Sequence, residues 1–527
     1  MTDSETPVHK RMRQKSRHVT FNADLFIYPI PMASAQMENH SRNDYVQLRL
    51  ITGRSKMHPA AAVAPSPLGT LPGMRRLGST SSSRSCKPTD VCVFLKDGSG
   101  HEFFLDNALV ETAHDLQQRM MESLGMPESA TEVFNIWIVS PLLQLQLKPY
   151  HIPFKLCRQW PDLLDKFTIA TEQQKANDEP VLTFQRNAFF PKSKEKTITD
   201  SKTLVRLFEE ARYNVLEGNY PCEPEDYEYL AAILAWIQHG TYPARREYGL
   251  FKDRLQEYVP LCMCKGGSRW LKNKQGFSNI ESRIFRQWED ISKKVKSKAD
   301  CYRLYLQFCW KLPFYGSVLF TGQIERSNTG IGLLDCPDRP VHIAINRDGV
   351  FVMDIIKQEL LLGLMYDELS WEYTEPEKNS ETCLSCLWLQ FDMDQGRRKI
   401  SHVLQIFSKQ SVMMNAMIEA CVDELNKQDI QLIHHERTVM DGLLSSGDNT
   451  PSTSNDDQDM VDPSVNPLRV AREAAAPAMS ESLPVKEPKT CISNQVDRLC
   501  LATFSEEGTL IKTKAKRPFS FAGIFGK

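Results

Sequence analysis

The chain has 527 residues, more than one hydrophobic core usually organises, so we expect about two to four domains. Apolar residues make up 41% and charged residues 25%, as in a soluble protein with real cores, while 30 Pro against 25 Gly indicate long irregular stretches. The net charge of −2 gives no basis for a dedicated nucleic-acid-binding protein.

No stretch of the sequence predicts a transmembrane segment or a secretory signal. The longest nearly unbroken apolar run, Tyr229–Ile237, is less than half of the ~20 residues that a membrane-spanning helix needs. The basic residues near the start lack the apolar run of a signal peptide. The 14 cysteines lack the dense, regular spacing of a small secreted protein and indicate reduced thiols, so we expect a cytoplasmic protein.

Residues 1–87 predict a disordered arm, because they are rich in Ser, Pro, Ala and basic residues. Arg75 and Arg76 precede Ser79 in a pattern that basic-directed kinases recognise. Ser79 is therefore a candidate phosphorylation site, where the added charge could recruit or release a partner.

Residues 88–195 predict a hairpin, a helix and further strands, an order typical of a ubiquitin-like roll. Alternating apolar residues from Val91 to Leu95 precede a glycine turn and a second strand, Phe103–Leu105. Thr112 predicts the start of a helix and Gly125 its end. The later strands are expected at Phe134–Val139, Leu143–Leu147 and Val181–Phe184.

Residues 196–312 change to helical periodicity and predict a helical bundle. The first helix begins near Asp200, where apolar residues recur three or four positions apart. Three more helices are expected at Asp226–His239, Glu281–Val295 and Asp300–Trp310.

Residues 313–426 predict seven strands followed by one helix, the pattern of a small barrel with a closing helix. On the helix Gln410–Leu425, one stripe of Met413, Met417 and Cys421 is expected to face the core. The strands are expected at Ser317–Ile324, Val341–Asn346, Val350–Ile355, Leu360–Met365, Leu369–Tyr373, Leu387–Phe391 and Val403–Phe407.

The chain after the closing helix predicts a disordered linker, residues 427–490, and a basic, aromatic C-terminal segment, residues 491–527. Three readings stay open for the second part: contact with an anionic membrane or a partner, a solvated tail, or docking back onto the folded lobes. The candidate contact residues are Lys512, Lys514, Lys516, Arg517, Phe519 and Phe521.

The cysteines do not predict a metal site. Cys383 and Cys386 have metal-ligand spacing, but the distant pair Cys262 and Cys264 has the wrong gap for a four-thiolate zinc site. No phosphate-binding loop, G-x-S-x-G or H-E-x-x-H motif occurs either. We therefore expect no metal, no cofactor and no catalytic residues.

Four motifs, in order along residues 88–426, resemble the FERM domain family. That resemblance implies an α+β fold of three lobes: a ubiquitin-like roll, a helical bundle like acyl-CoA-binding protein, and a PH/PTB-like barrel, here with disordered N- and C-terminal arms. The motifs are Leu216–Cys222, Leu230–Leu234, Leu312–Gly316 and Glu368–Trp371.

Further exposed runs, such as Trp137–Leu143 and Arg186–Lys192, resemble one member of this family closely. That resemblance implies a non-catalytic adaptor at the cytoplasmic face of the plasma membrane. Its partner would be the cytoplasmic N-terminal region of inactive rhomboids (iRhoms), whose complex with a metalloprotease sheddase it would stabilise at the cell surface. The alternative is a membrane–cytoskeleton linker or a signalling scaffold that binds other receptor tails or anionic phospholipid.

The third lobe is our first choice for the partner site, because an edge strand beside a helix can accept an extended peptide. Trp371 could line this groove, but large aromatic residues dominate protein cores, so we expect it to be core. The expected peptide contacts are Leu369, Ser370 and Glu372 on the strand, with Ser411 and Met414 on the helix.

Overall fold

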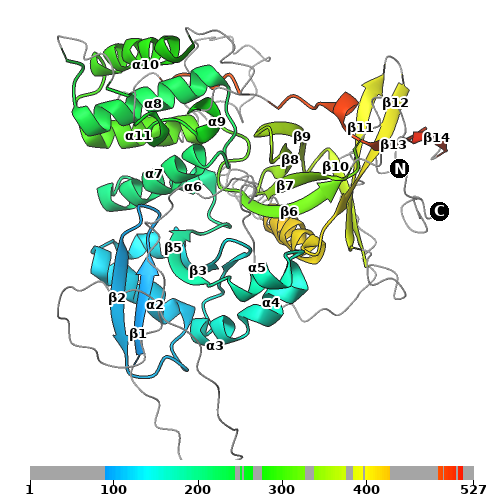
Figure 1. Cartoon of the computed structure of the whole chain (residues 1–527), viewed down its shortest axis with the longest axis horizontal. Coiled ribbons are helices and arrows are strands. Elements are labelled where there is room, and N and C mark those ends of the chain that lie inside the picture. The colour runs from blue at the N-terminus through cyan, green and yellow to red at the C-terminus, as the bar shows by residue number, and fades with distance from the viewer. Residues whose placement is uncertain are drawn as a thin grey trace, which may run out of the picture. The chain divides into compact units, whose positions relative to one another are not determined.

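The computed structural model describes residues 89–243, 250–251, 254–264, 276–326, 337–375, 384–395, 398–427, 485–490, 492–505 and 509–513 (Figure 1). The predicted N-terminal arm, with Ser79, lies outside these residues. The described residues form two compact units, one ending at Asn187 and the other beginning at Ala188. The lobe boundary predicted after Glu195 falls just inside the second unit.

The first unit contains a five-stranded sheet of order β2-β1-β5-β3-β4. β1 and β2 form the predicted hairpin, and the positive φ of 86° at Gly98 explains the glycine in its turn. β5, the last strand of this unit along the chain, lies between β1 and β3 in the sheet. It runs parallel to β1 and antiparallel to β3. The strands are β1 (Thr89–Phe94), β2 (Gly100–Leu105), β3 (Phe134–Val139), β4 (Gln144–Gln146) and β5 (Val181–Arg186).

The main helix of this unit, α2 (Ala113–Leu124), begins and ends where the sequence predicts. The Thr112 side chain accepts a hydrogen bond from the Asp115 backbone N–H, and the Asp115 carboxylate accepts one from the Thr112 backbone N–H at 2.8 Å. Gly125 ends the helix in the left-handed conformation, with φ at 59°.

Three short helices between β4 and β5 were not predicted: α3 (Pro153–Arg158), α4 (Trp160–Phe167) and α5 (Glu172–Ala176). α3 and α5 are too short to show a repeating apolar stripe, but α4 has one, Trp160, Leu163, Leu164 and Phe167, which the sequence reasoning missed. Burial stabilises α4, since Trp160 is 2% exposed and its indole N–H donates to Asp178 at 2.9 Å.

The second unit begins with the predicted helical bundle. α8 is central to it, because every residue from Asp226 to Trp236 is buried. Gly240, with φ at 81°, ends α8 as expected. The helices are α6 (Lys192–Glu195), α7 (Ser201–Leu216), α8 (Pro224–His239), α9 (Leu261–Cys264), α10 (Gly276–Ser292) and α11 (Lys298–Cys309).

A nine-stranded sheet completes the second unit, and the seven predicted strands form its path β10-β11-β12-β6-β7-β8-β9. A helix at residues 411–427 closes the barrel, and its predicted stripe of Met413, Met417 and Cys421 is buried. The seven strands are β6 (Val318–Ile324), β7 (Arg339–Ile345), β8 (Gly349–Asp354), β9 (Glu359–Met365), β10 (Leu369–Thr374), β11 (Cys386–Gln395) and β12 (Arg398–Phe407).

The other two strands belong to the C-terminal segment, by which we mean residues 485–490, 492–505 and 509–513. They are β13 (Leu501–Phe504), which pairs with β12, and β14 (Leu510–Thr513), which pairs with β13. Figure 1 shows β13 in red beside β12 in yellow. The linker boundary predicted at residue 490 therefore falls within a docked segment. Of the three readings of the tail, docking onto the lobes describes residues 492–505.

Candidate partner-binding surface

β10 lies at one end of the third-lobe sheet, as the predicted peptide site requires. Among the described strands it pairs only with β11, from Leu369 opposite Phe391 to Thr374 opposite Cys386. Its other edge carries backbone groups to which an extended peptide can add. Ser370 is exposed and Glu372 partly exposed, so both side chains are accessible beside that edge.

The other predicted contacts are buried. Ser411 and Met414 are each 0% exposed, and the Ser411 hydroxyl donates to the Ser408 carbonyl at 2.8 Å. They lie on the face of the closing helix that packs into the barrel, and Leu369 is also buried. This corrects the predicted helix wall: a charge at Ser411 or Met414 would destabilise the lobe before it affected a ligand.

Asn415, which the sequence reasoning missed, connects the closing helix to β10. Its side-chain oxygen accepts a hydrogen bond from the Trp371 indole N–H at 3.1 Å, and its amide donates to Glu419 at 3.1 Å. We expected Trp371 to be a core residue. Instead, its side chain is partly exposed and its indole N–H is hydrogen-bonded to Asn415. The sequence signal for this contact was Asn415 itself, a polar residue that directly follows Met414 on the closing helix.

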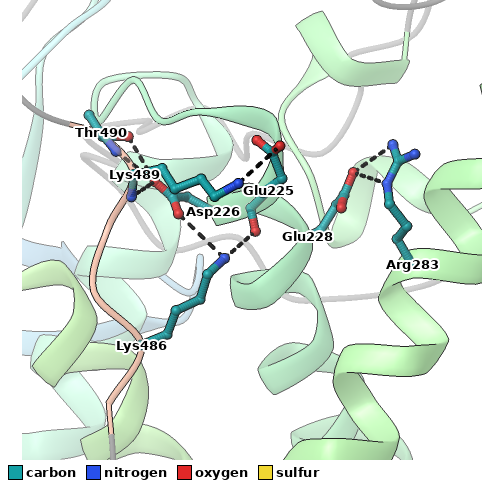
Figure 2. Close-up of polar contacts among 7 residues, drawn as sticks. All are labelled: Glu225, Asp226, Glu228, Arg283, Lys486, Lys489 and Thr490. Carbon is teal, nitrogen blue, oxygen red and sulfur yellow. Dashed lines mark hydrogen bonds and ion pairs between the residues drawn. The ribbon is translucent and has the colours of Figure 1, made fainter.

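The C-terminal segment contacts the first turn of α8 through a group of polar interactions (Figure 2). Asp226, with 0% of its surface exposed, is at their centre. One carboxylate oxygen accepts hydrogen bonds from the backbone N–H groups of Lys489 and Thr490, at 2.8 and 2.9 Å, and from the Thr490 hydroxyl at 3.0 Å. The Lys486 ammonium lies 3.5 Å from the other oxygen.

Neighbouring groups on α8 add to this contact. The Lys486 ammonium donates to the Glu225 carbonyl at 2.7 Å and lies 5.3 Å from the centre of the Tyr229 ring. The Lys489 ammonium lies 3.3 Å from the Glu225 carboxylate. These bonds, together with the position of Asp226 near a helix N-terminus, stabilise a buried negative charge.

β13 makes the second contact of the C-terminal segment, and this one is apolar. Ala502 and Phe504 are 0% and 5% exposed and share a cluster with side chains of β11 and β12. Leu499, Cys500 and Leu501 are buried as well. The cluster consists of Cys386, Trp388, Val403, Phe407, Ala502 and Phe504.

Of the predicted tail contacts, Lys512 lies within the described residues. Lys512 is exposed on β14 beside Leu510 and Ile511, which are 48% and 58% exposed. The other five basic or aromatic candidates lie outside the described residues: Lys514, Lys516, Arg517, Phe519 and Phe521.

The cysteine pairs considered for zinc do not come together in the part of the chain that the structure describes. Cys386 is buried at the start of β11, whereas Cys262 and Cys264 lie on α9, and Cys383 is outside the described residues. Within the same ranges, no three His, Cys, Asp or Glu side chains are grouped to hold a metal ion. None of the helices described there has the length and apolarity to cross a membrane.

Comparison with known proteins decides the family. The model of the FERM central domain matches residues 193–320, and that of the KRIT1/FRMD8 FERM domain C-lobe matches residues 339–417. FERM domain-containing protein 8 from Homo sapiens is 38% identical over 367 residues, covering 67% of this chain and 77% of the relative. The chain belongs to the FERM domain family.

A second sequence relative agrees with this FERM assignment. FERM domain-containing protein 8 from Danio rerio is 35% identical, over 66% of this chain and 75% of the relative. A solved structure of the FERM and C-terminal domain complex of Drosophila Merlin is 16% identical, with a TM-score of 0.40, and covers 65% of this chain and 98% of the other. The sequence relatives support a FERM adaptor or scaffold.

Proposed function

We propose that this FERM protein is a non-catalytic adaptor that binds the cytoplasmic N-terminal region of inactive rhomboids at the cytoplasmic face of the plasma membrane. By binding there it would stabilise the complex of the iRhom with its metalloprotease sheddase at the cell surface. The proposal draws on the likeness to FERM domain-containing protein 8 across two-thirds of the chain.

The observation that supports a peptide-binding role is the accessible edge of β10. Backbone hydrogen bonds to such an edge supply affinity for any extended segment, and the side chains beside it select among sequences. Ser370 and Glu372 on the strand, with Asn415 and Glu419 on the closing helix, are partly or fully exposed and could make that selection.

Titration calorimetry with an iRhom cytoplasmic peptide tests this site in the full chain. Ser370→Arg places a long cation beside the edge and should weaken binding by about 1 to 3 kcal/mol, as at a well-placed interface position, with little change in melting temperature. Ile356→Arg is the matched control, because Ile356 is 65% exposed on the β8–β9 turn of the same lobe.

Parent-like binding by Ser370→Arg, or equal loss in Ile356→Arg, would show that β10 is not the site. Binding that is absent from the parent chain as well would remove the iRhom assignment itself.

Contact with anionic phospholipid is a second candidate, suggested by the exposed Leu510 and Ile511 beside Lys512. Flotation with vesicles containing phosphatidylserine tests it. Lys512→Glu should reduce binding to these vesicles, and binding that is equal on neutral vesicles would argue against the electrostatic contact.

A further inference from the structure

The C-terminal segment covers a backbone edge of β12 that the rest of the sheet leaves open. β12 pairs with β11 along its whole length, but on its other side β6 meets it only where Phe407 lies opposite Gln323. β13 fills the next stretch, from Leu404 opposite Leu501 to Ser401 opposite Phe504. Residues 401–404 would otherwise present an unpaired edge.

The same segment covers β9, which ends the sheet on the other side. The Gly363 N–H donates to the Asn494 side chain at 2.8 Å, and the Gln495 N–H donates to the Leu361 carbonyl at 2.8 Å. The Gln495 side-chain amide also donates to the Leu360 carbonyl at 2.9 Å. Backbone groups of β9 that do not face β8 are thus satisfied by a segment more than a hundred residues away in the chain.

We propose that the C-terminal segment closes the edges of β9 and β12 against pairing with a second copy of this chain, and so leaves β10 as the edge for a partner. The second half of the proposal depends on the proposed function, and the first half does not. An open edge next to an apolar surface is the combination that makes sheets associate, and the segment covers both at β12.

When the segment is removed, we expect a second copy of the chain to bind in its place. An open strand edge can pair with the same edge of another copy, and the apolar side chains beside the two edges can then pack together. The edge at residues 401–404 lies beside Trp388 and Val403, which Ala502 and Phe504 cover in the intact chain. The new outer strand, β14, is only four residues long and carries Lys512, features that discourage further pairing.

The experiment replaces Ala502 with Asp in the full chain. Ala502 is 0% exposed within the apolar cluster, so a carboxylate there should detach β13. Ile511→Asp adds the same charge at a position that is 58% exposed. Hydrogen exchange of residues 401–404 and sedimentation velocity over a range of concentrations are measured for the parent and both variants.

We expect the amides of residues 401–404 that face β13 to exchange at least about tenfold faster in A502D, and A502D to form oligomers as its concentration rises, while I511D and the parent stay protected and monomeric. Continued protection of these β13-facing amides in A502D, or a detached β13 with no oligomers, would overturn the proposal. Oligomers in the parent or in I511D would overturn it as well.

A second measurement applies if A502D loses structure throughout, seen as fast exchange in α8. The parent chain, carrying a protease site between residues 428 and 484, is cut after folding, and the C-terminal fragment is then removed in mild denaturant. The remaining body should oligomerise and return to a monomer when the fragment is added back. A body that stays monomeric contradicts the proposal. Since no iRhom peptide is present, failure here is separate from failure of the proposed function.

Discussion

Two of the contacts that the C-terminal segment makes, one with α8 and one with β12, use different physics. At α8, a single buried carboxylate on Asp226 accepts three hydrogen bonds and faces the Lys486 ammonium. At β12, four residues of β13 add backbone pairing and bury Ala502 and Phe504 among apolar side chains. Hydrogen bonds to a charge fix geometry but return modest net free energy, since water competes for the same groups, whereas apolar burial supplies most of the stability.

This difference suggests that the α8 contact sets the path of the segment and the β12 contact sets its strength. Substitutions at the two contacts, and a change of pH, test this difference between them.

Phe504→Ala should have the largest effect. It removes a side chain that is 5% exposed in the β12 cluster, and such losses cost about 3 to 5 kcal/mol in a core that does not collapse around the gap. Urea unfolding of the full chain, followed by hydrogen exchange of β12 and β13, measures it. Ile511→Ala is the exposed control and should change stability by less than about 0.5 kcal/mol. Equal effects of the two variants would mean that apolar burial does not hold this segment.

Asp226→Ala should weaken the α8 contact by about 1 to 3 kcal/mol, because several donors, including Lys486, lose an ionised acceptor. Hydrogen exchange should rise at residues 486–490 and stay slow at 501–504.

The matched control is Glu228→Gln on the same helix. Glu228 is buried and pairs with Arg283 at 2.7 Å, and Figure 2 marks no hydrogen bond or ion pair between it and the C-terminal segment. This variant should destabilise the middle lobe without faster exchange at residues 486–490. A loss of β13 protection in Asp226→Ala would contradict the division between the two contacts.

Acid should weaken the third lobe, which receives β13, through His342 on β7. Burial lowers the pKa of His342 from 6.5 to about 3. As the pH falls below 6.5, the imidazole of His342 binds a proton in the unfolded chain but stays neutral in the folded chain. The free energy of unfolding therefore falls by up to about 1.4 kcal/mol per pH unit until the pH nears 3.

Urea unfolding at pH 7 and pH 5.5 measures this slope. His342→Gln should reduce it, and His114→Gln, at an exposed position on α2, should not. A slope that is the same in the parent and in His342→Gln would assign the acid sensitivity to other groups.

Lys489→Ala should have the smallest effect, about 0.2 to 1 kcal/mol, because its ion pair with Glu225 is exposed and screened by salt. The backbone N–H of Lys489, which donates to Asp226, is kept in this variant. Exchange at residues 486–490 should therefore rise slightly at low salt and match the parent at high salt. A large effect would mean that side-chain charge, more than backbone hydrogen bonding, positions the segment.

Much of the fold could be predicted from the sequence, because its signals are local. The start of α2 at Thr112 and its end at Gly125 depend on the backbone needs of a helix, which neighbouring residues satisfy. The seven strands of the third lobe and the stripe of Met413 and Met417 follow from short apolar periods in the same way.

The candidate site was predicted less well. The strand Leu369–Thr374 and its place at a sheet edge agree with expectation, yet Ser411 and Met414 proved to be buried. Spacing along a helix shows which residues share a face. It cannot show how wide the buried face is, because that depends on the sheet packed against it.

Only the tertiary structure assigned the C-terminal segment to the fold. Leu501–Phe504 is too short to show strand periodicity, and Lys486–Thr490 has the composition of a linker. Their order comes from partners that lie far away in the sequence: the backbone edge of β12 and the carboxylate of Asp226. The residues adjacent in sequence do not indicate such distant partners. The sequence therefore determined the individual helices and strands, whereas contacts between distant residues decided that β13 and β14 join the sheet.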